Sequence, residues 1–167
     1  PFRPWMAALT LTIVPILQAG YSPTSGVDRN VDAYGDANGK TMRFFETAEQ
    51  QLGFFSNLSE EAQRQFLRES ITEAERGPVL INQLTAAWDR GDMESLEGVI
   101  IDDTRENYPE VYQALFVARN NAWMETLVRE MQGSGVDFVA VGAGHMLGED
   151  GLVEQFRARG FTVERVE

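Results

Sequence analysis

The sequence contains no cysteine and only one histidine among its 167 residues. Without cysteine, the chain can form no disulfide, no thiolate metal site and no cysteine nucleophile. Basic residues are also scarce, because 14 Lys and Arg stand against 26 Asp and Glu and give a formal net charge of −12. Proteins bind phosphate backbones through clustered Lys and Arg, so we expect no nucleic-acid partner.

A long uncharged stretch lies near the start of the chain, in the sequence PWMAALTLTIVPILQAG. Its apolar part, residues 5–17, is shorter than the roughly 20 residues that a membrane span needs, and Pro15 interrupts it. We therefore predict a buried helix. The core of a signal peptide, with Arg3 upstream, is the alternative, although LQAGY offers no A-x-A cleavage site. Because the chain begins with Pro1 and not Met, we expect a piece of a longer protein.

Helical patterns dominate the middle of the chain. Ser59 is a predicted N-cap, Gly91 is a helix stop, and Asp92 caps the helix that follows. Apolar residues at steps of three and four predict one long helix over residues 108–131. We expect residues 47–105 to form a helical, cap-like region.

Three short apolar segments predict strands. They are TMRFFET (41–47), VDFVAVG (136–142) and FTVERV (161–166). A short helix in EDGLVEQFRARG separates the last two, so the chain would end in a strand–helix–strand unit. The expected fold is α/β (α+β), a single partial domain over residues 1–167. Residues 1–46 would form helices and the first strand, and residues 106–167 the long helix and the strand–helix–strand unit.

The histidine, His145, follows the second predicted strand, in the sequence VGAGHMLG. Ligands collect at the carboxyl ends of strands in open α/β sheets, and imidazole serves as a metal ligand or as an acid and base near neutral pH. Gly142 and Gly144 would let backbone approach a ligand closely. The alternative is a structural histidine that is hydrogen-bonded inside a turn, with glycines needed only for positive φ.

Two further residues could act with His145. Glu46 ends the first predicted strand, so a carboxylate and an imidazole would meet at one sheet edge, where they could hold a divalent metal or activate water. The alternative for Glu46 is a solvent-facing carboxylate. Arg119, in the long helix, could clamp a substrate carboxylate or stabilise negative charge, or it could be a surface residue paired with one of the many acids.

Several motifs occur together over nearly the whole chain. In order they are GVD, which ends at Asp28, FETAEQQL, AAWDRGD, VARNNAWM and FVAVGAGHMLGEDGL, and the chain closes with GFTVERV. Their order and spacing resemble the TraB/GumN family, whose members are relatives of the Tiki proteases and, more distantly, of ChaN-like proteins.

The resemblance extends to individual residues. Gly142 to His145 matches the second of the two G-x-x-H motifs that the family carries. Glu46 matches the glutamate of the family's LET motif, with Phe45 in place of leucine, and Arg119 and Asn120 match its RN pair. The first G-x-x-H motif has no counterpart in this sequence, so the resemblance implies the C-terminal portion of a member.

For function, the resemblance implies a metal-dependent, peptidase-like hydrolase with a divalent Mn, Co or Zn ion. His145 and Glu46 would be its metal ligands, or Glu46 its general base, and Arg119 would stabilise negative charge. The substrate would be a peptide or a protein. As a fragment, the chain would be inactive alone and would need the N-terminal segment of the same protein, or a homo-oligomer, to cover its open core.

Two alternatives stay open at this point. The chain could be a non-catalytic regulator that binds peptides or partners, or a structural piece anchored at a membrane by its first segment. Bacterial members of the family often carry a signal peptide or a lipoprotein anchor, so the resemblance implies a periplasmic or envelope-anchored protein.

Overall fold

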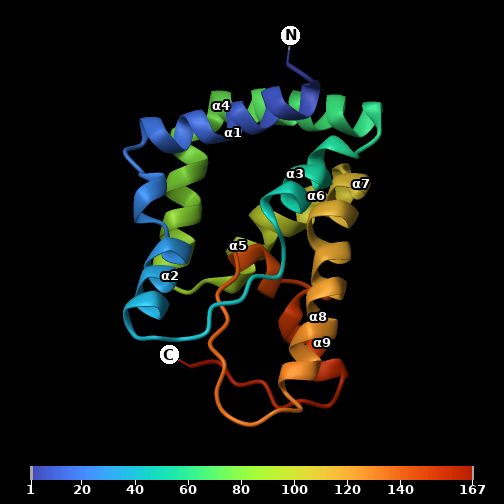
Figure 1. Ribbon diagram of the computed structural model, residues 1–167. Coiled ribbons are helices and arrows are strands. Elements are labelled where there is room, and N and C mark those ends of the chain that lie inside the picture. Colours follow the sequence, from blue (N-terminus) through green and yellow to red (C-terminus); the bar gives the residue numbers. More distant parts are fainter. Residues whose placement is uncertain (1, 167) are drawn as a thin grey trace. The chain divides into compact units, whose positions relative to one another are not determined.

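The computed structural model describes residues 2–166, which fall into two compact units. The first unit ends at Asp89 and the second begins at Arg90. Every regular element in the described residues is helical (Figure 1). Unit 1 contains α1 (Pro4–Gln18), the 3-10 turn η1 (Pro23–Ser25), α2 (Val27–Ala37), α3 (Ala48–Ser56) and α4 (Glu60–Asp89). Unit 2 contains α5 (Met93–Glu97), η2 (Gly98–Asp102), α6 (Asp103–Asn107), α7 (Pro109–Tyr112), η3 (Gln113–Val117), α8 (Ala118–Glu130), η4 (Ala143–Met146) and α9 (Leu152–Ala158).

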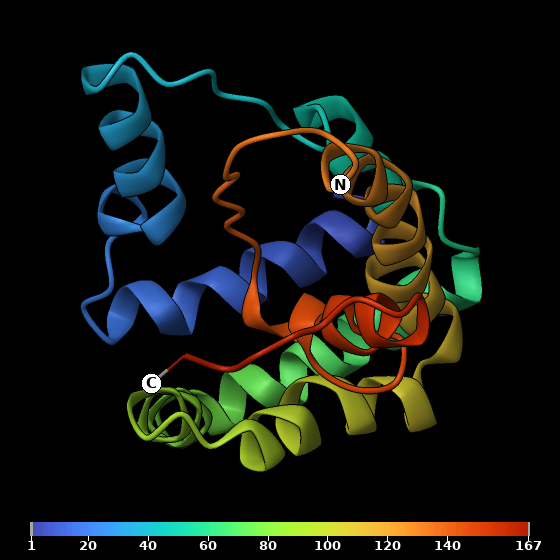
Figure 2. The ribbon, with the colours of Figure 1, turned by 90° about the horizontal axis from the view of Figure 1, so that it is seen from below.

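Unit 1 is held together by the packing of α1 along α4 (Figures 1 and 2). Trp5 and Ala8 are buried in this contact. A Cβ atom on Gly77 of α4 would lie only 2.9 Å from the Cβ of Pro15, so the glycine allows the two helices to approach closely. Five large apolar side chains of α1 are exposed: Met6, Ile13, Val14, Ile16 and Leu17. None of the helices within residues 2–166 has both the length and the apolar character that a membrane crossing requires.

Short-range capping fixes where α3 begins. The Thr47 hydroxyl accepts a hydrogen bond from the Gln50 amide at 3.2 Å, and the Gln50 side chain accepts one from the Thr47 amide at 2.8 Å. This capping box satisfies two amides that the first turn of a helix leaves without an intrahelical partner. The rings of Phe55 and Phe66 then stack at 5.7 Å and attach α3 to α4.

Unit 2 is organised around one long helical stretch that runs from α7 through η3 into α8 (Figure 1). The turn η3 is π-helical, so it holds one more residue than an ordinary helical turn. The unit's buried apolar side chains come from several of its helices and turns: Leu96, Ile101, Val111, Tyr112, Trp123, Met124, Leu127, Leu147 and Leu152. The turn η4 packs against α9, and α9 packs against α8.

The prediction of an α/β fold is wrong, because the described residues contain no strand and form an all-α structure. The three segments expected as strands, 41–47, 136–142 and 161–166, are irregular chain. Val136 and Phe138 are 99% and 80% exposed, where a strand buried on both faces was expected. An apolar run favours extended backbone locally, but a strand exists only when a neighbouring strand supplies hydrogen bonds. The expected strand–helix–strand unit is therefore α9 with an irregular segment on each side.

The predicted helix ends are confirmed where the sequence carries a local capping or stop residue. Asp92 caps α5 by accepting a hydrogen bond from the Ser95 amide at 3.1 Å, and Ser59 accepts one from the Ala62 amide at 3.1 Å at the start of α4. Gly91 adopts a positive φ of 60° just beyond α4. Between Ser59 and Gly91, α4 is one continuous helix of 30 residues.

Candidate functional site around His145

The residues singled out from the sequence are divided between the two units. Arg119 and Asn120 lie in α8, and Gly142, Gly144 and His145 lie at or in the turn η4, all within unit 2. In unit 1, Asp28 lies in the first turn of α2. Glu46 precedes α3 and its Oε2 accepts a hydrogen bond from Gln51 Nε2 at 3.4 Å. The sheet edge at which Glu46 and His145 were expected to meet is absent from residues 2–166.

His145 is a buried side chain with a relative exposure of 7%. The turn that carries it is closed by a hydrogen bond from the His145 amide to the Gly142 carbonyl at 3.0 Å. The imidazole packs against the ring of Trp123, with the centroids 4.3 Å apart, and against the ring of Phe116 at 5.5 Å. The two aromatic rings give the imidazole apolar surroundings and limit how it can turn.

Asn120 connects α8 to the turn that carries His145. Its Oδ1 lies 2.7 Å from His145 Nδ1. Its Nδ2 donates a hydrogen bond to the carbonyl of Asp150 at 2.9 Å and a longer one to the carbonyl of His145 at 3.4 Å. One buried side chain thus contacts both ends of the loop from His145 to Asp150.

A second connection reaches the same loop from α7. The hydroxyl of Tyr112 donates a hydrogen bond to Asp150 Oδ2 at 2.8 Å. Burial of the phenol, followed by this bond to the carboxylate, raises the pKa of Tyr112 well above its ordinary value of 10.0. Tyr112 is therefore a neutral donor at physiological pH. The Asp150 carbonyl also accepts a hydrogen bond from Gln155 Nε2 at 3.0 Å, so α9 holds the loop as well.

Of the glycines in the motif, Gly144 is needed for space. A Cβ atom there would lie 2.8 Å from Phe116 Cε1 and 2.9 Å from Ile100 Cγ2. Neither Gly142 nor Gly144 has a positive φ, whereas Gly148, at the far side of the turn, has a φ of 72°. Gly144 is therefore needed for close packing against protein side chains, and Gly148 for left-handed backbone.

Arg119 is half-buried against the same aromatic side chain as His145. Its guanidinium carbon lies 4.8 Å from the centroid of the Trp123 ring, and its Nη1 donates a hydrogen bond to the Leu115 carbonyl at 3.2 Å. A cationic group and an imidazole therefore both contact Trp123. A guanidinium carries a permanent positive charge and can stabilise negative charge on a group that it approaches.

Sequence reasoning missed Tyr112, Phe116, Trp123 and Asp150. A regular helix over residues 108–131 would place Val111, Leu115, Ala118 and Ala122 on one apolar face. The last two are exposed, because the extra residue in the π-helical turn η3 moves the inward face by one position. The signal in the sequence was the neighbouring stripe, Tyr112, Phe116, Asn120 and Trp123, whose four side chains contact His145 or its loop.

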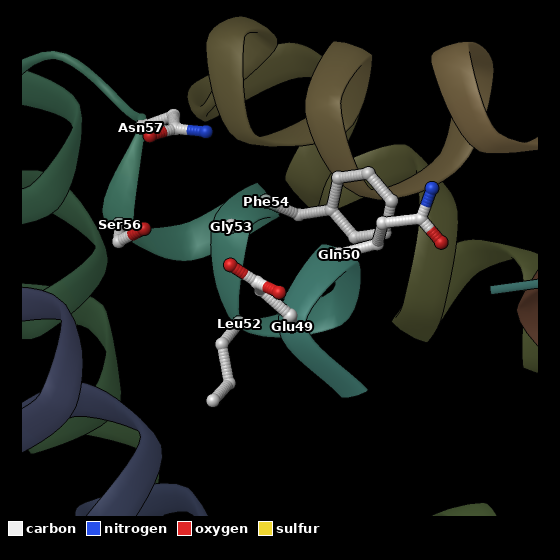
Figure 3. Close-up of a pocket in the computed structure, with 7 residues that line it drawn as sticks. All are labelled: Glu49, Gln50, Leu52, Gly53, Phe54, Ser56 and Asn57. Atoms are coloured by element: carbon white, nitrogen blue, oxygen red, sulfur yellow. The ribbon is translucent and has the colours of Figure 1, made fainter. Parts of the chain in front are cut away.

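A different feature of the surface lies beside α3 in unit 1. A hollow of about 790 Å³ is lined by Glu49, Gln50, Leu52, Gly53, Phe54, Ser56 and Asn57. Figure 3 shows that Leu52 and Phe54 point to opposite sides of the helix. The lining residues therefore surround α3 and do not converge on one point. Glu49 is the only ionisable side chain among them, so the hollow offers less chemistry than the cluster around His145.

The chain can also be compared with known proteins. No curated protein and no solved structure matches it. The model of the TraB/PrgY/gumN family does match, over residues 1–165. The matched region contains both units and every residue of the cluster around His145. Since the match covers essentially the whole sequence, the chain belongs to the TraB/PrgY/gumN family.

Proposed function

We propose that the chain forms part of a metal-dependent hydrolase that acts on peptides or proteins, with His145 at its reacting centre. The observation that carries the proposal is the 2.7 Å contact between His145 Nδ1 and the buried Asn120 side chain. An imidazole that is oriented through one nitrogen acts as a base or as a ligand through the other. Arg119 supports the same assignment, because it contacts the same Trp123 ring as His145 and acyl transfer builds negative charge that a cation stabilises.

A divalent metal ion, Mn, Co or Zn, is part of the proposal by family resemblance. When bound, it would polarise the scissile carbonyl or activate a water molecule. In the part of the chain that the structure describes, no three His, Cys, Asp or Glu side chains gather into a metal-binding group. A catalytic zinc site usually has three protein ligands, so these residues alone do not fit such an ion. Further ligands would have to come from groups outside residues 2–166.

The roles of individual residues follow from this arrangement. We assign His145 the transfer of a proton to or from water, which is within the range of an imidazole near neutral pH. We propose Arg119 as the group that stabilises negative charge and Glu46 as a ligand or general base of the complete protein. A homo-oligomer, or the remaining part of the same protein, would complete the site, and the proposed location is the periplasm or the envelope of a bacterium.

The full-length protein, incubated with a peptide mixture and Mn²⁺, Co²⁺ or Zn²⁺, tests the proposal. Cleavage is expected with at least one of the three ions, and it should stop when a chelator is added. It should be abolished in His145→Ala and retained in Met146→Ala, which changes the adjacent, partly exposed residue of the same turn. Absence of cleavage with all three ions, or full activity of His145→Ala, would contradict the proposal.

The second candidate function is peptide binding without catalysis. It is favoured by residues 136–141, an irregular and mostly apolar segment whose first four residues are exposed, and which makes no backbone–backbone hydrogen bond within the described chain. Such a segment can accept an extended peptide through its free amides and carbonyls. Binding of peptides by the full-length protein without metal, without cleavage and without any effect of His145→Ala would support this candidate over the hydrolase.

A further inference from the structure

The amide group of Asn120 can be oriented from its neighbours. One end of the amide faces two carbonyl oxygens, those of Asp150 at 2.9 Å and of His145 at 3.4 Å. Carbonyl oxygens only accept hydrogen bonds, so this end must be the nitrogen, which donates. A flipped amide would set its oxygen against both carbonyls and lose both bonds. The oxygen of Asn120 is therefore the atom that lies 2.7 Å from His145 Nδ1.

This orientation determines where the imidazole carries its hydrogen. The amide oxygen has no hydrogen to give, so the hydrogen in the 2.7 Å contact must belong to Nδ1 of His145. A neutral imidazole has one N–H group, and the lone pair then lies on Nε2. We infer that Asn120 is a positioning residue that holds neutral His145 in the Nδ1–H tautomer and makes Nε2 the nitrogen that reacts. The inference deepens the proposed function. It rests on that function only in naming Nε2 as the nitrogen that reacts.

The surroundings of Asn120 suit a positioning role. The side chain is only 1% exposed, so water does not compete for its hydrogen bonds. Its nitrogen holds the Asp150 carbonyl, while Tyr112 holds the Asp150 carboxylate at 2.8 Å. Two side chains from the same long helical stretch thereby fix the loop that carries His145. The rings of Phe116 and Trp123 keep the imidazole turned toward Asn120.

The sole histidine makes a direct test simple. Long-range ¹H–¹⁵N NMR spectra of the full chain contain one set of imidazole signals, which belongs to His145. At a pH where the ring is neutral, Nδ1 is expected to show the ¹⁵N shift of a protonated nitrogen and Nε2 that of an unprotonated one. The opposite pattern in the unmodified protein would overturn the inference, whether or not the protein hydrolyses peptides.

Two neighbouring variants separate a positioning role of Asn120 from a general effect on the stability of the protein. Asn120→Ala removes the acceptor of the Nδ1 hydrogen, whereas Asn121→Ala changes the same residue type one position later, on an exposed part of α8. In Asn120→Ala, we expect the second tautomer to appear in spectra of this chain, and kcat of the full-length protein to fall by about 10- to 100-fold with little change in KM. Asn121→Ala should keep both the tautomer and the rate.

The outcomes of these measurements distinguish the tautomer inference from the proposed hydrolase function. If Asn120→Ala keeps a pure Nδ1–H tautomer, the positioning role is refuted. If this chain shows the expected tautomer but the full-length protein cleaves no peptide, the hydrolase proposal fails while the tautomer assignment stands. Circular dichroism of Asn120→Ala reports whether the helices persist, and the measurement on the unmodified protein is decisive even when this variant does not fold.

Discussion

Replacing Tyr112 with phenylalanine removes one hydrogen bond and leaves no cavity. Tyr112 is 4% exposed, and its hydroxyl donates to the Asp150 carboxylate at 2.8 Å. Hydrogen bonds to charged groups contribute about 1.5–3 kcal/mol to stability, and the loss is smaller when the remaining partner can be hydrated. Asp150 is half-buried, so part of its lost bonding is recovered from water. We expect Tyr112→Phe to lower the free energy of unfolding of unit 2 by about 1–2 kcal/mol at pH 7.

The pH dependence of the same variant gives a second, independent result. The pKa of Tyr112 is raised in the folded protein, so its stabilising effect is complete below the unfolded-state pKa and is lost as pH rises toward the folded value. With an unfolded pKa of about 10, ionisation of the unfolded chain removes about 1.4 kcal/mol by pH 11. The stability difference between the unmodified protein and Tyr112→Phe should therefore nearly close between pH 7 and pH 11.

Urea denaturation, followed through the indole N–H resonance of Trp123, measures both results. Trp123 reports on unit 2, because Trp5 and Trp88 lie in unit 1. With a urea dependence of about 1 kcal/mol per M, the midpoint at pH 7 should fall by about 1–2 M. Tyr34→Phe is the control, since Tyr34 is 67% exposed in α2 of unit 1. A difference below about 0.5 kcal/mol at pH 7, or one that is the same at both pH values, would refute the reasoning.

Three further changes test other parts of the structure. Gly144→Ala should destabilise unit 2 by about 1–3 kcal/mol, because a Cβ atom there would crowd Phe116 and Ile100. Urea denaturation measures this loss, and an unchanged midpoint would disprove the crowding. Hydrogen bonds from Ser95 lower the pKa of Asp92 below 3.8, so the stabilising effect of this N-cap is present above that value and is lost as the pH falls through the folded pKa. Asp92→Asn keeps an N-cap that does not titrate, so thermal melting below pH 4 should be less acid-sensitive than in the unmodified protein. Thr47→Ala should cost about 1 kcal/mol through loss of the α3 capping box, visible as faster amide exchange in α3 and contradicted by unchanged exchange there.

The parts of the fold that follow from the sequence are those with short-range causes. Gly91 adopts a positive φ just after α4, where the sequence predicted a helix to stop, and Asp92 caps α5 as the sequence predicted. The expected sheet failed because Val136 to Val141 carry a strand-like pattern but no partner within the described chain. A hydrophobic pattern records only what the local backbone prefers, whereas a sheet depends on a second segment that the pattern does not identify.

The candidate site also combines features that the local sequence indicates with contacts between distant residues that it does not indicate. The sequence drew attention to His145 through its glycine turn and to Asn120 through a motif, but it gave no reason to join them. Their contact links residues 25 positions apart, and its geometry depends on the face that α8 presents after a π-helical turn. Neither the amide orientation nor the role of Tyr112 could be deduced without knowing which side chains that face brings inward.

The π-helical turn η3 also restricts how this protein can change by insertion and deletion. Tyr112 lies before the turn and Asn120 after it, yet both hold Asp150. Loss of a single residue from η3 would restore regular α-helix and rotate the one side chain relative to the other by about 100°. The helix would keep most of its backbone hydrogen bonds after such a deletion. However, the side chains of Tyr112 and Asn120 would no longer point toward the same loop. The length of residues 113–117 is therefore under a constraint separate from that on their identities.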